Sequence, residues 1–203
     1  MDMDGLTLLE KIRGRNPTLG KIKEWARKNW TGLQGEGPVI NSLVNGWFSF
    51  RFRCREDVDL IGNSVWTYGK TPFQLKQWTP LFYAETEQLD TILVWVRLPG
   101  LPLEFWNPTY LSEIEDELGT FIEADLSFQQ TKIKKVVRIL VSLNIRTSLP
   151  EAFNFLWKNK QKRQLLDYEG LPFQCQKCHE TRHLARNYPN FVPSTTRRRK
   201  WVR

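Results

Sequence analysis

The stretch VINSLVNGWFSFRFRC, residues 39–54, predicts two antiparallel strands joined by a tight turn. Asn45-Gly46 is a hairpin signal, because Asn and Gly tolerate the positive φ that two-residue turns require. After the turn, the sequence alternates with the period of a strand. We expect one face to point to a core and the other to lie outside. The core face would carry Phe48, Phe50, Phe52 and Cys54, and the outer face Trp47, Ser49, Arg51 and Arg53.

The flanking sequence adds the remaining elements of a βαββαβ order. A strand is expected within residues 6–15, and Asn16-Pro17-Thr18 predicts the start of a helix that continues to Trp30. Residues 55–64 suggest a second helix, and residues 72–78 a last strand. This is the order of an RRM-like (ferredoxin-like) sheet with two helices on one face, which we place at residues 5–80.

Residues 81–170 predict a second α+β segment packed on the first. Apolar periodicity indicates strands at 92–98, 120–126 and 133–145, and a hairpin around residues 158–160. Asn107 and Pro108 predict the cap and first residue of a helix that ends near Leu118. A knuckle-like segment at 171–189 and a basic tail at 190–203 follow, and the tail is predicted to be disordered. The expected fold class is α+β.

Charge is distributed unevenly along the chain, whose formal net charge is +8. Residues 1–128 carry a net −5, residues 129–163 carry +8, residues 164–170 carry −2 and residues 171–203 carry +7. Basic blocks attract phosphate backbones or anionic lipid headgroups. A solvated charged face would explain one such block, but two dense blocks, one of them next to a Cys/His cluster, favour nucleic acid as the partner. No apolar run approaches the ~20 residues of a membrane helix, so we expect no membrane.

The cysteines and the first residues bear on the compartment. Three Cys, two of them only three positions apart, do not suit a secreted disulfide framework. The start, MDMDGLTLLE, is acidic and lacks the basic and apolar regions of a signal peptide. We expect an intracellular protein, and a nuclear one rather than a cytoplasmic one, because residues 197–200 (RRRK) have the composition of an import signal.

The segment CQKCHETRH, residues 175–183, has the spacing of the first three ligands of a zinc knuckle. Two thiolates on one tight turn, followed by an imidazole, can hold one Zn²⁺. The fourth position is Tyr188, a poor ligand because a phenol titrates near pH ~10. Two hypotheses remain open. Zn²⁺ is held by Cys175, Cys178 and His183 with His179 or water as the fourth ligand, or the knuckle has decayed and keeps only its basic residues.

Further residues are candidates for contact with nucleic acid. Residues 45–52 partly match the RRM octamer, so Trp47 could stack a base and Arg51 could contact a phosphate. An ordinary half-buried strand is the simpler explanation of this octamer. Near the C-terminus, Trp201 among arginines adds base stacking to phosphate contact. The complete set of candidates is Lys177, Arg182, Arg186, Arg197, Arg198, Arg199, Lys200, Trp201, Trp47 and Arg51.

The sequence contains no catalytic pattern. Both His lie in the knuckle-like segment, and the acidic residues of 113–117 resemble a solvated helix face. There is no Walker loop, dinucleotide fingerprint or nucleophile elbow. We therefore expect no enzymatic activity and no small-molecule substrate.

Three stretches together resemble a large family of plant retrotransposon-related, gag-like proteins. They are LKQWTP (75–80), VWVRLPGLPLEFW (94–106) and YEGLPFQCQKC (168–178). The chain is similar to the first-reading-frame product of plant LINE-type elements, in which a domain of unknown function precedes a CCHC zinc knuckle. The resemblance runs from about Leu6 to Tyr188. It implies an RRM-like domain, RNA or single-stranded DNA as partner, and zinc at the knuckle. Tyr188 departs from the family's fourth ligand, and Arg182 replaces the Gly usual before the His.

The sequence thus predicts a protein that binds single-stranded RNA or DNA with little sequence preference. The alternative is a gag-like scaffold that forms a homo-oligomer through its Trp-rich body and has little intrinsic nucleic-acid binding. A relic without present function is a third hypothesis.

Overall fold

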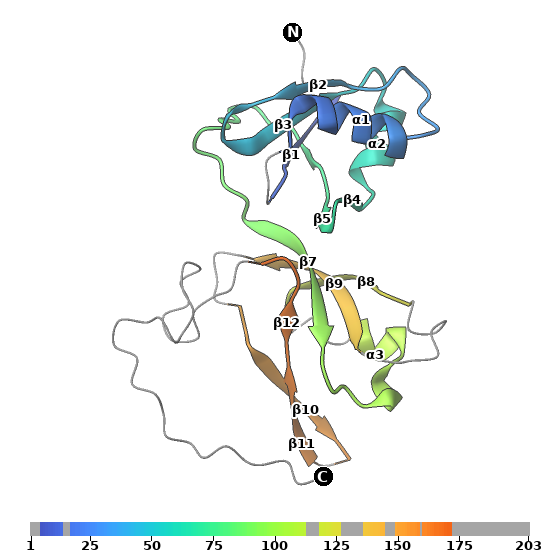
Figure 1. Cartoon of the computed structure of the whole chain (residues 1–203), viewed down its shortest axis with the longest axis vertical. Coiled ribbons are helices and arrows are strands. Elements are labelled where there is room, and N and C mark those ends of the chain that lie inside the picture. Colours follow the sequence, from blue (N-terminus) through green and yellow to red (C-terminus); the bar gives the residue numbers. More distant parts are fainter. Residues whose placement is uncertain are drawn as a thin grey trace. The chain divides into compact units, whose positions relative to one another are not determined.

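A computed structural model describes residues 5–13, 17–112, 118–126, 136–144, 149–158 and 160–171, without the side chains of residues 156, 157 and 160. The chain divides into two compact units, Met1–Gly170 and Leu171–Arg203. The described part of the first unit begins with β1 (Thr7–Lys11), α1 (Leu19–Asn29), β2 (Val39–Ser42), η1 (Val44–Gly46), β3 (Trp47–Arg51), α2 (Arg55–Gly62), β4 (Trp66–Tyr68), β5 (Thr71–Phe73) and β6 (Lys76–Gln77). It continues with β7 (Thr91–Leu98), η2 (Leu103–Phe105), α3 (Pro108–Ser112), β8 (Thr120–Ala124), β9 (Val137–Asn144), β10 (Ala152–Trp157), β11 (Lys160–Leu165) and β12 (Asp167–Tyr168), as Figure 1 shows.

The N-terminal sheet has the strand order β2-β3-β1-β6, and all its pairs are antiparallel. With α1 after β1 and α2 after β3, this is the split βαβ arrangement that the element order predicted. The mixed α+β class is therefore confirmed. The predicted last strand at 72–78 is divided, because β5 pairs with β4 in a hairpin and only β6 pairs with β1.

Local sequence signals explain where these elements begin and turn. Thr18 is the N-cap of α1, and its Oγ1 accepts a hydrogen bond from the Lys21 N–H at 3.4 Å. At the predicted hairpin, Asn45 and Gly46 have φ of 58° and 79°, the left-handed conformation that these residue types tolerate. The prediction for Cys54 is wrong: it is half-buried at the N-cap position of α2, without a side-chain capping hydrogen bond, instead of lying in the core.

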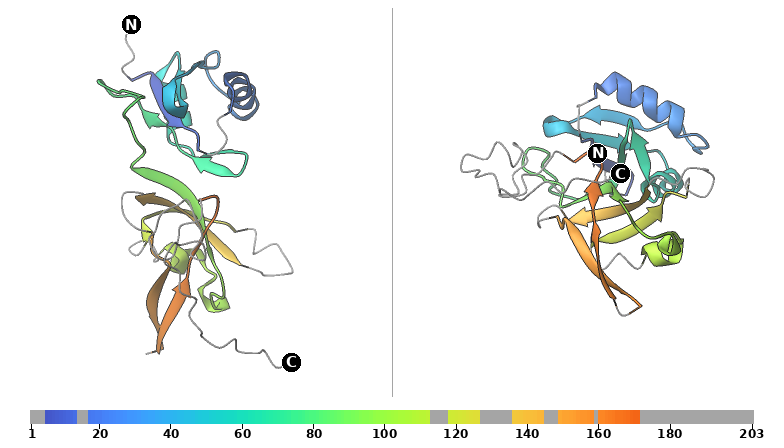
Figure 2. Two further views of the ribbon diagram at one scale, coloured as in Figure 1. Left: turned by 60° about the vertical axis from the view of Figure 1, so that its left-hand side comes forward. Right: turned by 60° about the horizontal axis from the view of Figure 1, so that its bottom comes forward.

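The core of the N-terminal sheet lies on the face that α1 and α2 cover. Ile22, Ala26 and Trp30 recur at helical spacing along α1 and are at most 5% exposed. The Trp30 ring meets the Phe50 ring of β3 edge-on, with 5.2 Å between centroids. Figure 2 shows α1 on one side of this sheet. The predicted apolar face of β3 is therefore buried against the helices, and this hydrophobic burial stabilises the N-terminal sheet.

A second antiparallel sheet has the order β12-β7-β9-β8. Its strand β9 is buried on both faces, because Ile139, Leu140 and Val141 are all fully inaccessible. The helix predicted from Asn107 begins as expected, since the Asn107 Oδ1 accepts from the Thr109 N–H at 2.8 Å. Strands β10 and β11 form the predicted hairpin as a separate two-stranded sheet.

Candidate nucleic-acid interface

The outer face of the N-terminal sheet is closed at Trp47. This residue is fully buried, and the ring of Phe82 packs edge-on against it at 5.0 Å. Phe82 belongs to residues 78–87, here named the covering segment. It is fastened at one end by the Trp78 N–H, which donates to the Thr7 carbonyl at 2.9 Å. At the other end, Glu87 pairs with Lys76 at 2.8 Å.

The expectation that Trp47 lies on an exposed face is therefore wrong. The covering segment and two lysines occupy its surroundings, with Lys76 Nζ at 4.7 Å and Lys11 Nζ at 5.9 Å from the ring centroid. No acceptor among the described residues faces the buried Trp47 Nε1–H. In this conformation the indole is unavailable to a stacking base. Arg51, at the other end of β3, is half-buried, and its phosphate contact remains a prediction.

Arg97 and Arg138, the two arginines considered on the second sheet, both form ion pairs. Arg138 Nε lies 2.6 Å from Asp125, and its Nη1 lies 3.1 Å from Glu169. Partial burial opposes the charged form of Arg138, but the hydrogen bond and attraction from Asp125 outweigh it and raise its pKa. Arg97 pairs with Asp167, and this hydrogen bond raises the Arg97 pKa. These two arginines are thus largely neutralised by neighbours.

The β10–β11 hairpin keeps its cations exposed. Lys162 and Arg163 are exposed on β11 and point to opposite faces of the hairpin, because they are adjacent along a strand. No ion pair with another described residue holds either of them. At the turn, Lys158 has φ of 48°. The hairpin therefore presents positive charge on both faces through Lys162 and Arg163.

A row of aromatic rings begins on the face of the hairpin that carries Lys162. Phe155 is directly opposite Lys162 in the hairpin register. Its ring meets that of Phe105 at 5.1 Å, and Phe105 in turn meets Tyr110 at 5.8 Å. Phe155 and Phe105 are half-buried, and Tyr110 is 43% exposed. Cations beside partly exposed rings suit single-stranded nucleic acid, since phosphates take the charge and bases can stack on the rings.

Sequence reasoning did not single out this surface. It predicted the hairpin and the basic block at 129–163, but it listed neither Lys162 nor Arg163 as a site residue. The available signal was the alternation of Phe153, Phe155 and Trp157 before a run of lysines at even positions, 158–162. Such alternation predicts a hairpin in which aromatic residues of the first strand lie opposite basic residues of the second strand.

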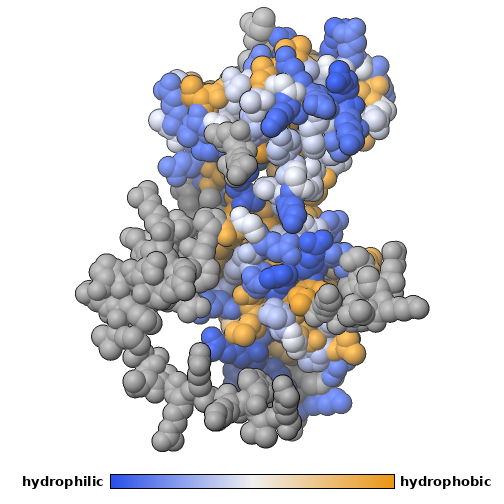
Figure 3. Space-filling view, in the orientation of Figure 1, coloured by the Kyte–Doolittle hydropathy of each residue, from blue (hydrophilic) through white to orange (hydrophobic). Residues whose placement is uncertain are grey.

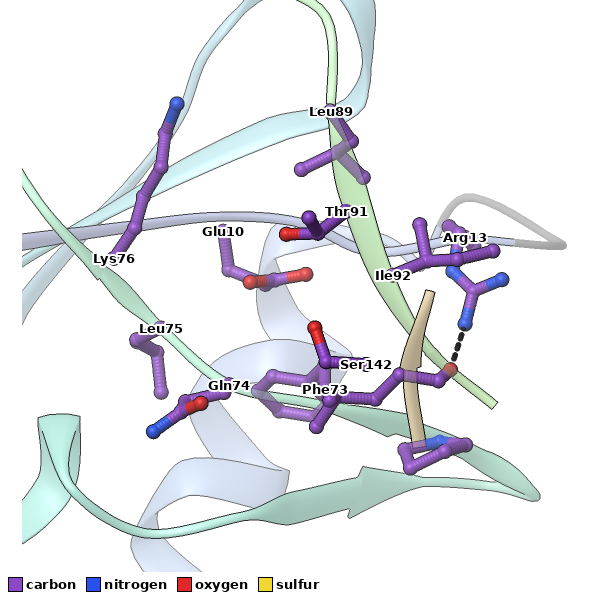
Figure 4. Close-up of a pocket in the computed structure, with 12 residues that line it drawn as sticks. Glu10, Arg13, Phe73, Gln74, Leu75, Lys76, Leu89, Thr91, Ile92 and Ser142 are labelled. Carbon is purple, nitrogen blue, oxygen red and sulfur yellow. Dashed lines mark hydrogen bonds between the residues drawn. The ribbon is translucent and has the colours of Figure 1, made fainter. Parts of the chain in front are cut away.

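A cavity of about 190 Å³ lies between β1, the β5–β6 region and β7 (Figure 4). Glu10 lines it and is 6% exposed; burial raises the pKa of its carboxyl to about 8, against the opposing attraction of Arg13 and Lys76. Burial lowers the pKa of Arg13, whose Nη2 donates to the Leu93 carbonyl at 2.5 Å. The space is smaller than the several hundred Å³ of a typical ligand site. We interpret these groups as part of the packing between β1 and β7.

The remaining candidates lie outside the described residues. They are Cys175, Cys178, His183, Tyr188, Lys177, Arg182, Arg186, Arg197, Arg198, Arg199, Lys200 and Trp201. Among the residues that are described, no group of His, Cys, Asp and Glu could hold a metal ion. The described helices include none long and apolar enough to cross a membrane. Figure 3 shows hydrophilic residues spread over the visible face, with apolar residues in small groups between them.

The fold defines an α+β protein that begins with a split βαβ sheet. Residues 5–86 match the model of a family described as "Domain of unknown function (DUF4283)". The match ends within the covering segment, so it includes both the sheet and Phe82. One solved structure that resembles the chain is titled "Structure of the RNA binding domain of Hrp1 in complex with RNA", with 14% identity, a TM-score of 0.33, and coverage of 81% of this chain and 96% of that chain. A search of curated proteins found no match.

Proposed function

We propose that the protein binds single-stranded RNA or DNA with little sequence preference, without catalytic activity. The observation that carries this proposal is the β10–β11 hairpin, where exposed Lys162 lies opposite Phe155 on one face and exposed Arg163 lies on the other face. A phosphate backbone would bind the cations, and bases would stack on partly exposed rings regardless of sequence. The net +7 of residues 171–203 adds a second basic region that follows the hairpin in the sequence.

The finer description of the protein is gag-like and related to plant retrotransposons. It is supported by the three sequence stretches at 75–80, 94–106 and 168–178. In this proposal, Cys175, Cys178 and His183 hold a Zn²⁺ ion that orders a basic loop against the nucleic acid. We also propose that the protein is intracellular and that residues 197–200 direct it to the nucleus.

The test of binding is a titration of a fluorescein-labelled single-stranded RNA with the full chain at several salt concentrations. Each neutralised phosphate contributes about −0.7 to the slope of log affinity against log salt. Deletion of residues 171–203 should weaken binding and make the slope shallower, because it removes eight Lys and Arg. An unchanged slope would mean that these residues do not contact the strand. Absence of any salt-dependent binding by the full chain would refute the proposed function.

Zinc is tested separately with a chromophoric chelator. Tyr188→Cys should tighten zinc binding, because a thiolate supplies both the missing ligand and a negative charge. Equal affinity of the two proteins would show that His179 or another group already completes the site. No zinc uptake by either protein would mean that the segment is only a basic peptide.

Self-association is the second candidate function. It is supported by separate exposed apolar residues of the N-terminal part, such as Leu81, which is 81% exposed. Sedimentation of the full chain without nucleic acid distinguishes the two functions. A mass that increases with concentration, combined with absent RNA binding, would favour the scaffold.

A further inference from the structure

A groove of about 670 Å³ runs between α1 and the edge strand β2, on the helix-covered side of the N-terminal sheet. Its floor is apolar, because Ala26, Trp30 and Ile40 line it and are each at most 5% exposed. Figure 2 shows α1 lying next to this strand. The volume is within the range of built ligand sites, roughly 300–1,000 Å³.

The strand that borders the groove has one free edge. In the described sheet, β2 is the outermost strand and pairs only with β3. Alternate residues of an edge strand direct their N–H and C=O groups away from the sheet. Edges that are not used for binding are commonly blocked by Lys or Pro within the strand. The four residues of β2, VINS, have neither, although Pro38 directly precedes the strand and lines the groove, and Val39 at the start of the strand is 62% exposed.

The charged side chains among the described residues that line the groove are both basic. Lys23 and Arg27 line it from successive turns of α1, and both are exposed. Two acidic residues of neighbouring segments, Glu36 and Asp57, are engaged elsewhere. Glu36 pairs with Arg53 at 2.5 Å, and the Asp57 carboxylate accepts hydrogen bonds from the backbone N–H groups of residues 34 and 35 at 2.8 and 3.1 Å. The hydrogen bond from residue 34 is the main cause that lowers the Asp57 pKa.

The loop that closes the groove leaves room for a bound chain. Gly32, Gly35 and Gly37 all line it, so this wall consists mostly of backbone. A Cβ added at Gly32 or Gly37 would meet nothing within 4 Å. The Asp57 hydrogen bonds and the packing of Leu33 against the core hold this loop in place. The open space beside Gly32 and Gly37 leaves room for an extended peptide along this part of the loop.

We propose that an acidic, extended segment of a partner protein binds in this groove by adding a strand to the free edge of β2. Main-chain hydrogen bonds to β2 would supply affinity, and alternate side chains would supply specificity. Apolar side chains would lie over the floor at Ala26 and Trp30, and carboxylates would pair with Lys23 and Arg27. This site is separate from the hairpin that carries the proposed nucleic-acid binding.

A nucleic acid fits the groove less well than a peptide. Its bases would need an exposed aromatic face to stack on. Among the described residues that line the groove, the one aromatic residue is Trp30, which is 5% exposed. A sugar-phosphate backbone also lacks the repeating N–H and C=O groups that pair with a strand edge. The free edge therefore favours polypeptide.

The test uses the full chain and a fluorescein-labelled probe peptide, Glu-Val-Glu-Val-Glu-Val, in a fluorescence anisotropy titration. The matched peptides are Lys-Val-Lys-Val-Lys-Val, which reverses the charge, and the acidic peptide with its alternate amides N-methylated, which cannot complete a strand ladder. The acidic peptide should bind, and both matched peptides should bind at least about tenfold more weakly. Amide NMR shifts should locate the peptide at residues 39–42.

The protein variants separate the groove from general positive charge. Lys23→Glu combined with Arg27→Glu should weaken the acidic peptide by about tenfold or more, because two exposed ion pairs become repulsive. Lys21→Glu combined with Lys28→Glu is the control, since both residues are exposed cations of α1 that do not line the groove. Circular dichroism verifies that both variants are folded.

Three outcomes would overturn the proposal. They are absence of binding by the acidic peptide, equal losses in the two variant pairs, and tight binding of the N-methylated peptide. The groove would be assigned to nucleic acid instead if single-stranded RNA displaced the peptide from the native chain and if Lys23→Glu with Arg27→Glu abolished RNA binding. Retained RNA binding in the same variants would show that the proposed function stands independently of this site.

Discussion

Two regions of the molecule combine the same residue types with opposite results. On the N-terminal sheet, Trp47 has lysines over its ring, but Phe82 covers it and leaves it fully buried. On the β10–β11 hairpin, Phe155 stands opposite Lys162, and both keep part of their surface exposed. A basic and aromatic composition therefore does not identify a binding face. What lies over the rings decides whether a base can reach them.

The largest effect is expected from Trp47→Ala. Truncation of a fully buried Trp leaves a cavity under Phe82 and should lower the free energy of unfolding by about 3–5 kcal/mol. Affinity for single-stranded RNA, corrected for the folded fraction, should change little. Urea unfolding and RNA titration on the same samples measure the two effects. A folded variant with abolished RNA binding would show that the covering segment opens and that the sheet face is the true site.

The second prediction concerns Glu10, whose buried carboxyl should make the free energy of unfolding depend on pH. Burial raises the pKa of its carboxyl from the ordinary value of 4.5 to about 8 in the folded protein. Between these pH values the folded state keeps a proton that the unfolded chain releases, so stability should fall as pH rises through this window and level off above it.

Glu10→Gln removes this titration and should be more stable than the native sequence at pH ~8, by about 2 kcal/mol or more, and closer to it at pH ~5. The measurement is urea unfolding between these pH values. Glu24→Gln, at an exposed position of α1, is the control and should leave the pH dependence unchanged. Equal pH dependence of the native sequence and Glu10→Gln would contradict the assigned burial effect.

A smaller effect is expected at the hairpin. Lys162→Gln with Arg163→Gln should weaken single-stranded RNA binding about tenfold at moderate salt and make the salt slope shallower, because two phosphate contacts are lost. Arg97→Gln with Arg138→Gln is the comparison, because those arginines already have carboxylate partners. Similar losses in affinity for both pairs would show that net charge, and not the exposed hairpin, governs binding.

The sequence predicted much of the fold because the relevant signals are local. Thr18 caps a helix, Asn45-Gly46 turns a hairpin, and Asn107 with Pro108 begins another helix. Each depends on residues within a few positions of one another. The last strand of the N-terminal sheet was less well predicted, because β5 and β6 differ in which distant strand they pair with. Residue type at 72–78 does not decide that choice.

The candidate site shows the same division. By itself the sequence determined that basic residues gather after residue 128 and that the spacing of Cys175, Cys178 and His183 suits a metal. Periodicity also fixed which residues of β3 share a face, since side chains alternate along any strand. Only the tertiary structure decided that the face of Trp47 is covered, that Arg138 is paired, and that β2 has a free edge beside α1. The reason is physical: alternation assigns a side chain to a face, but exposure and pairing depend on segments that reach that face from elsewhere in the chain.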